Sequence, residues 1–225
     1  MATRVTKRAP RAGATERGGK EDKPGKGGAG SWKKDPGGRR QRVLDEATRL
    51  FSQRGYGAVS TVDVARAAGV AEGSVFHYFG SKQQLLRAVG ERYGAEFAAA
   101  MFSGVAPVAS SLTIAQVVTR AFEFVERNWP GFGLFLLSDG PSAAPLAQKA
   151  NREVVTRAVE GVLEAWGEQG AMPGVDAHVV AELLFGLVEA ALRACFAGGG
   201  APRERYEAET VAAISRILCL ELRIA

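Results

Sequence analysis

The stretch SVFHYFGSK, residues 74–82, places hydroxyl, imidazole and ammonium groups around four consecutive ring side chains. A helix distributes four consecutive side chains around its whole circumference, so these rings cannot all face one core. The hydroxyl and ammonium groups donate hydrogen bonds, which is the chemistry that holds phosphate and other oxygen acceptors. The side chains that face outward are therefore candidates for binding a partner.

The sequence offers little support for catalysis. It contains no nucleophile paired with a base, no phosphate-binding loop and no carboxylate pair placed for acid–base work. The Gly-rich stretches 25–30 and 198–200 do not lie between a strand and a helix, so they are not dinucleotide motifs. The two histidines lack metal-ligand spacing, and two cysteines are too few for a disulfide framework. We therefore expect that the protein is not an enzyme and binds no cofactor or metal. We also expect it to work in a reducing compartment.

The residues before and within this stretch have the spacing of a helix-turn-helix. Two short helices that cross steeply need a small residue where they touch, and Ala65 supplies it. Four positions later Gly69 tolerates the positive φ of the turn, and six positions after that Val75 is apolar. The spacing predicts short helices over 61–68 and 72–79.

Helix geometry separates the second of these helices into two faces. Val75 and Phe79 are four residues apart, so they lie on one face and are predicted to be buried. A recognition helix offers its N-terminal residues to base edges in the major groove of DNA. The residues left to face outward are Ser74, His77 and Tyr78, with Phe76 at the flank of the buried face.

Residues 61–86 resemble the DNA-binding end of the TetR/AcrR family of bacterial transcriptional regulators. The resemblance covers about residues 39–90. The motif residues are Thr61, Ala65, Ala68-Gly69-Val70, Ser74, Val75, Phe76-His77-Tyr78, Phe79, Ser81-Lys82 and Leu85-Leu86. The resemblance implies contacts with DNA from Thr61, Gly73, Ser74, His77, Tyr78 and Lys82.

Each of these positions also has a structural explanation. Ser74 could be only a first-turn residue, Tyr78 a packing residue and Lys82 a solvated lysine. Glu72 departs from the common pattern, because its charge suits a helix N-terminus but repels phosphate. We expect Glu72 either to point away from the duplex or to accept a hydrogen bond from a cytosine N4.

Helical periodicity continues along the chain and predicts an all-α protein of about nine helices in two domains. Residues 39–90 form the helix-turn-helix domain, in which the first helix begins at Arg39 and stops at Gly55, and Ser81 caps a fourth helix. Residues 91–225 form a second helical domain. Its predicted helices cover 113–128, 130–137, 145–169, 176–196 and 203–222.

Charge is concentrated at the N-terminus. The net charge is +5, but residues 1–42 hold thirteen Lys or Arg and four Asp or Glu, which leaves −4 for the remainder. Residues 1–38 contain nine glycines and are predicted to be disordered. They are either a solvated extension or an arm that binds polyanions. The longest apolar runs fall far short of the ~20 residues that span a membrane.

The second domain is predicted to provide dimerisation and a ligand pocket. The helix over 176–196 is apolar except for one stripe, so it must be covered on most sides. The resemblance implies a four-helix dimer interface made from this helix and the last one. The candidate pocket residues are Phe122, Asn128, Trp129, Phe135, Trp166, His178 and Glu182. Any of the aromatic ones could equally fill the core, and the polar stripe could face solvent or form interface pairs.

These patterns predict a homodimer that binds a palindromic operator in double-stranded DNA and regulates transcription. We expect a repressor that a small apolar or amphipathic effector releases. The alternative is a DNA-binding protein that organises the chromosome without an effector, which the basic tail would suit. Both hypotheses place the protein in the bacterial cytoplasm, at the nucleoid, and not in a membrane.

Overall fold

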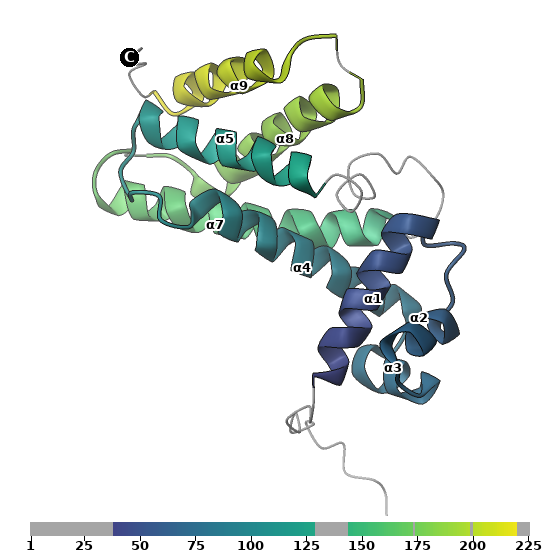
Figure 1. The fold of residues 1–225 in the computed structure, drawn as a ribbon. Helices are drawn as coiled ribbons and strands as arrows, with labels where there is room; N and C mark the ends of the chain where they lie inside the picture. The colour runs from purple at the N-terminus through teal and green to yellow at the C-terminus, as the bar shows by residue number, and fades with distance from the viewer. Residues whose placement is uncertain (1–37, 129–143, 173, 199, 220–225) are drawn as a thin grey trace, which may run out of the picture. The chain divides into compact units, whose positions relative to one another are not determined.

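The computed structural model describes residues 38–128, 144–172, 174–198 and 200–219 (Figure 1). Over these residues the chain forms eight α-helices and no strand, which confirms the all-α prediction. The helix expected over 130–137 and nearly all of the N-terminal tail lie outside the described residues.

Three helices form the N-terminal part: α1 (Arg39–Arg54), α2 (Thr61–Ala68) and α3 (Glu72–Phe79). Helix α1 buries one apolar stripe and ends at Gly55, as predicted, where φ is 77°. Its buried members are Val43, Leu44, Ala47, Leu50 and Phe51. This stripe supplies one wall of the core onto which α2 and α3 pack.

The turn between α2 and α3 has the geometry that its residue types predict. Ser60 caps α2, because its hydroxyl accepts from the Asp63 N–H at 3.1 Å while the Asp63 carboxylate accepts from the Ser60 N–H at 2.9 Å. Gly69 takes a φ of 63°, which a side chain would disfavour. Ala65 is buried between the helices, and Val75 is fully buried. The predicted helix-turn-helix is confirmed.

Helix α4 (Lys82–Phe102) extends from this unit into the rest of the chain (Figure 1). The Ser81 hydroxyl caps it by accepting from the Gln84 N–H at 3.1 Å, as predicted. Its first turns bury Leu85 and Leu86 in the core that α1 and α3 share. Its last turns bury Phe97 and Met101 beside α5. One continuous helix therefore belongs to both parts of the molecule.

Four further helices complete the described chain: α5 (Ser111–Arg127), α7 (Ala144–Glu168), α8 (Ala177–Phe196) and α9 (Arg203–Ile217). Helix α7 packs along α4 and against α8, while α9 packs against α5 and α8 (Figure 1). Ser110 and Asp176 cap α5 and α8. None of the described helices is both long and apolar enough to cross a bilayer.

The contact between α4 and α7 depends on two glycines. Gly90 and Gly94 are four residues apart and lie on one face of α4. A Cβ on Gly94 would lie 2.9 Å from the Asn151 carbonyl oxygen and from the Val154 Cβ, and a Cβ on Gly90 would overlap the backbone of Ala147. The two helices therefore approach closer than any side chain at these positions would allow.

We expect Gly90→Ala to lower the free energy of unfolding by about 1–3 kcal/mol, because the methyl group overpacks the contact with Ala147. Gly161→Ala is the matched control, since a Cβ on this helical glycine meets nothing within 4 Å. It should raise stability by up to about 1 kcal/mol through helix propensity. Urea unfolding measures both variants. Equal effects of the two substitutions would contradict the close contact.

Candidate nucleic-acid interface and ligand cavity

Helix α3 has one buried face and one exposed face, as the sequence predicts. Val75 and Phe79 anchor it in the core. Gly73 and His77 are exposed on the other side, while Ser74 is half-buried. Tyr78 is half-buried too, packs against the edge of the core and lies 5.4 Å from the His77 ring, centre to centre. The polar groups of α3 therefore lie at its leading edge and outer side.

Phe76 is a candidate that the sequence prediction missed. It was expected at the flank of the buried face, yet 46% of it is exposed. An exposed aromatic side chain on this helix can make apolar contact with a partner. Its position in the aromatic run was visible in the sequence, but the run alone does not show which ring the core excludes.

Thr61 and Glu72 join the starts of α2 and α3. The Thr61 hydroxyl donates to the Glu72 carboxylate at 3.1 Å. The carboxylate of Glu72 therefore lies at the start of α2. The bond also fixes the two helix starts relative to each other.

Lys82 is held by the loop that precedes α2. Its Nζ donates to the Tyr56 carbonyl oxygen at 2.6 Å and lies 4.0 Å from the centre of the Tyr56 ring. Partial burial lowers the pKa of Lys82 from its ordinary value. An ammonium group has three donors, and the Tyr56 carbonyl takes one of them. Lys82 is thus a positioned lysine rather than a solvated one.

Two arginines of α1 hold α2 and α3 in place. The Arg40 guanidinium lies 4.9 Å from the centre of the Phe79 ring, and the Arg42 Nε donates to the Ala68 carbonyl at 3.4 Å. Ala68 is the last residue of α2, where free carbonyls attract a cation. No pattern in the sequence signals either contact, because the partners are far apart along the chain.

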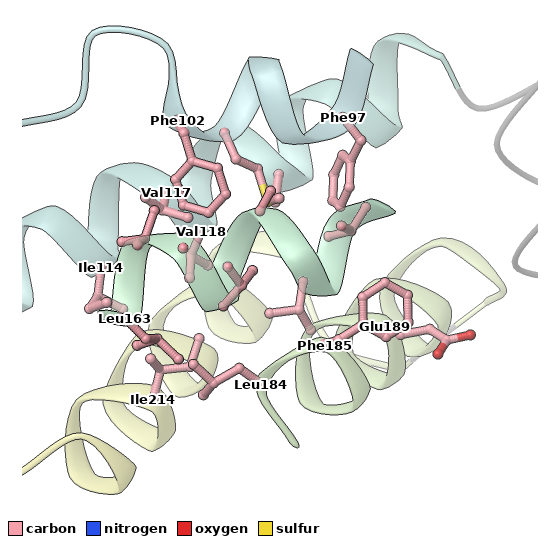
Figure 2. A pocket seen from close by; sticks show the side chains of 18 of the residues that line it. Phe97, Phe102, Ile114, Val117, Val118, Leu163, Leu184, Phe185, Glu189 and Ile214 are labelled. Carbon is pink, nitrogen blue, oxygen red and sulfur yellow. The ribbon is translucent and has the colours of Figure 1, made fainter. Parts of the chain in front are cut away.

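A cavity of about 620 Å³ lies between α4, α5, α7, α8 and α9. Its wall is mainly apolar, with Phe97 and Phe102 from α4, Ile114 from α5 and Leu184 from α8 among its members (Figure 2). The volume lies within the ~300–1,000 Å³ typical of sites for small ligands. The carboxylate of Glu189 lies at the border of the cavity, beyond the labelled apolar side chains (Figure 2).

The cavity includes one of the predicted pocket residues, Trp166. Phe122 is fully buried but is not part of the wall, and the Asn128 amide donates to the Phe124 carbonyl at 2.8 Å. His178 is exposed, with Nδ1 3.4 Å from a Glu160 carboxylate oxygen. Trp129 and Phe135 lie outside the described residues. The described wall therefore groups Trp166 with residues that the sequence did not mark, such as Asn151.

An ion-pair network accounts for the polar stripe of α8. The Arg152 guanidinium of α7 lies 3.1 Å from a Glu182 carboxylate oxygen, 3.2 Å from one of Glu189 and 4.7 Å from the centre of the Phe185 ring. Arg193 also contacts Glu189 at 3.4 Å. Glu182 and Glu189 of the stripe therefore pair with α7 of their own chain, while His178 is exposed. Glu182 is thus an ion-pair partner beside the cavity.

Comparison with known proteins shows likeness in both sequence and fold. Residues 43–89 match the model of the family described as bacterial regulatory proteins, tetR family. These residues include α2, α3 and the first turns of α4. The helix-turn-helix part of this chain is therefore similar in sequence to that family.

The curated relatives of this chain carry regulator names. The chain is 30% identical over 102 residues to the HTH-type transcriptional repressor KstR2 of Rhodococcus jostii. This alignment covers 44% of this chain and 48% of that protein. The chain is 42% identical over 52 residues to the HTH-type transcriptional regulator AcrR of Shigella flexneri, and this alignment covers 23% of this chain and 24% of that protein. The chain thus spans about half or less of the length of these curated relatives.

The likeness in fold extends further along the chain than the likeness in sequence. A crystal structure of a putative TetR-family regulator from Syntrophomonas wolfei aligns with a TM-score of 0.66 at 16% identity. The alignment covers 83% of this chain and 98% of that one. The helices after the helix-turn-helix therefore keep the fold where the sequence has diverged.

The cap of α2 should make the stability of the protein depend on pH. Hydrogen bonds from Ser60, with smaller contributions from Arg54 and Arg66, hold the pKa of Asp63 below its usual value near 3.8. The stability from this bond is therefore complete above about pH 4 and is lost as the pH falls through the lowered pKa of the folded state. We expect Ser60→Ala to cost about 0.5–2 kcal/mol at pH 7 and less at pH 3.

Urea unfolding at both pH values measures this loss. Ser110→Ala is the matched control, because Ser110 caps α5 through the N–H of Thr113, which carries no carboxylate. Its cost should not change with pH. A Ser60→Ala cost that is equal at pH 7 and pH 3 would contradict the role of Asp63.

Proposed function

We propose that the protein is a homodimeric, sequence-specific DNA-binding regulator of transcription that inserts α3 into the major groove of a palindromic operator. The observation that carries the proposal is the division of α3 into a face anchored by Val75 and Phe79 and an outer face with Gly73 and His77 exposed. A helix-turn-helix offers such an outer face to base edges.

The residues around α3 have chemistry that suits a duplex. Gly73 allows the backbone to approach closely, and the Ser74 hydroxyl can bond to a base edge or a phosphate. The Tyr78 hydroxyl and the remaining Lys82 donors suit phosphate oxygens, whereas the Thr61 hydroxyl at the start of α2 already donates to the Glu72 carboxylate. His77 can bond to a base edge, and Phe76 can contact a thymine methyl. The charge of +9 on residues 1–42 would strengthen binding without adding sequence preference.

A dimer is needed because one helix-turn-helix contacts only a half-site. Helix α8 carries an exposed apolar face that suits self-association. Val179 and Leu183, four residues apart, are 51% and 60% exposed, and Ala190 and Ala194 continue the exposed side. A second copy of this face would cover these side chains in a two-fold arrangement.

The cavity favours a ligand-responsive repressor over a chromosome-organising protein without an effector. A space of about 620 Å³ in the second domain has no role in DNA packaging, whereas it suits a small molecule that shifts the conformation. The relatives named above are a transcriptional repressor and a transcriptional regulator, which supports regulation rather than catalysis. Such a protein would work at the nucleoid of the bacterial cytoplasm.

Selection of bound duplexes from a random pool tests this proposal with the full chain. We expect a palindrome whose half-sites lie one helical turn apart, or a multiple of it. A Ser74→Ala, His77→Ala double variant should then bind the selected duplex at least about 30-fold more weakly, because two base contacts of about 1–3 kcal/mol each sum to about 2–6 kcal/mol. Its affinity for random duplex should stay close to that of the wild type.

Gln116→Ala is the control, because Gln116 is an exposed polar residue of α5 outside the helix-turn-helix. It should leave both affinities unchanged. The proposal is wrong if no consensus duplex emerges, or if the double variant binds the selected duplex as tightly as the wild type does.

A further inference from the structure

The wall of the cavity holds two buried polar side chains whose hydrogen-bonding groups are unpaired. The Trp166 Nε1 and the Asn151 Oδ1 have no hydrogen-bond partner in the described part of the chain. Trp166 is 3% exposed and Asn151 is 6% exposed, and both contribute to the wall. A buried polar group without a partner is unfavourable, so such groups mark places where a ligand can supply the missing bond.

The two groups lie far apart along one helix. Asn151 and Trp166 both belong to α7 and are separated by fifteen residues, which is about 22 Å along the helix axis. Their directions around the axis differ by only about 60°. Between them α7 contributes Val155, Val159 and Val162 to the wall. The α7 wall is therefore apolar between the two groups, and its other polar residues, Gln148, Lys149 and Arg152, lie near the Asn151 end.

The charged groups of the wall are already neutralised. Arg152 is bound by Glu182 and Glu189, and Glu189 is bound by Arg193 as well. The Lys149 Nζ is 3.9 Å from a Glu153 carboxylate oxygen, and its side chain is 74% exposed. Residues 129–143, outside the described structure, contain one aspartate and no Lys or Arg. An anionic ligand could therefore pair with Arg152 or Lys149 only by replacing the carboxylates that these residues already contact.

We propose, on the basis of the ligand-responsive function above, that the effector is an elongated, uncharged and mainly apolar molecule with a hydrogen-bonding group at each end. An indole N–H only donates, so the ligand presents an acceptor to Trp166. The Asn151 oxygen only accepts, so the ligand presents a donor there. A hydroxyl group meets either requirement, which makes a long diol or hydroxy-ketone the simplest chemical class.

Three probes of equal chain length test this class with the full protein and no DNA: dodecane-1,12-diol, dodecan-1-ol and dodecanoate. Isothermal titration gives the Kd of each. We expect the diol to bind about fivefold tighter than the mono-alcohol, the ratio of one net hydrogen bond. Dodecanoate should bind at least about tenfold more weakly than the diol, because its charge is buried without a cation.

Two variants test which protein group binds each end of the ligand. Trp166→Phe keeps a ring but removes the N–H, and Asn151→Ala removes the acceptor; each should abolish the advantage of the diol over the mono-alcohol. Thr156→Val is the matched control, because the Thr156 hydroxyl is also buried and unpaired within the described chain but lies outside the cavity wall. It should keep the diol advantage.

Three results would overturn the proposal: dodecanoate binding as tightly as the diol, no binding of any probe, or a diol advantage that survives both cavity variants. Operator selection by the same protein separates this failure from failure of the proposed function. Selective duplex binding without the expected ligand order would refute only the ligand class, whereas the expected ligand order without selective duplex binding would refute the regulator.

Discussion

The close approach of α4 and α7 at Gly90 and Gly94 constrains the rest of the structure. Because no side chain separates the two backbones there, α4 cannot shift along or away from α7 without losing that contact. The same α4 buries Leu85 and Leu86 in the helix-turn-helix core and presents Phe97 to the cavity. The position of α3 and the shape of the cavity are therefore set by one shared helix.

This constraint suggests how a ligand could act at a distance. Asn151 lies in the cavity wall, and its backbone carbonyl contacts the Gly94 side of α4. A ligand that bonds to Asn151 acts on the residue that touches α4. It shifts the conformation only if it binds one arrangement of the two helices better than the other. The ion pairs of Arg152 with Glu182 and Glu189 hold α7 to α8, so the opposite side of α7 has less freedom to move.

The sequence predicted those structural features that depend only on residues close together in the chain. The Ser81 cap, the turn at Gly69 and the anchors Val75 and Phe79 all follow from spacing within a few residues. Contacts between distant segments left no such pattern. The bond from Lys82 to Tyr56, the Arg152 network and the glycine contact with α7 appear only once the helices are packed. The choice of pocket residues depends on the same packing, and of those predicted Trp166 lies in the described wall.

Amide hydrogen exchange of the full chain, with a selected duplex and with a scrambled one, tests the central claim that α3 binds DNA and shares α4 with the cavity. The account predicts protection over 72–79 with the selected duplex only, together with changed exchange in α4 around Gly90 and Gly94 and in the facing turns of α7. Unchanged exchange over 72–79, or changes confined to α8 and α9, would contradict it.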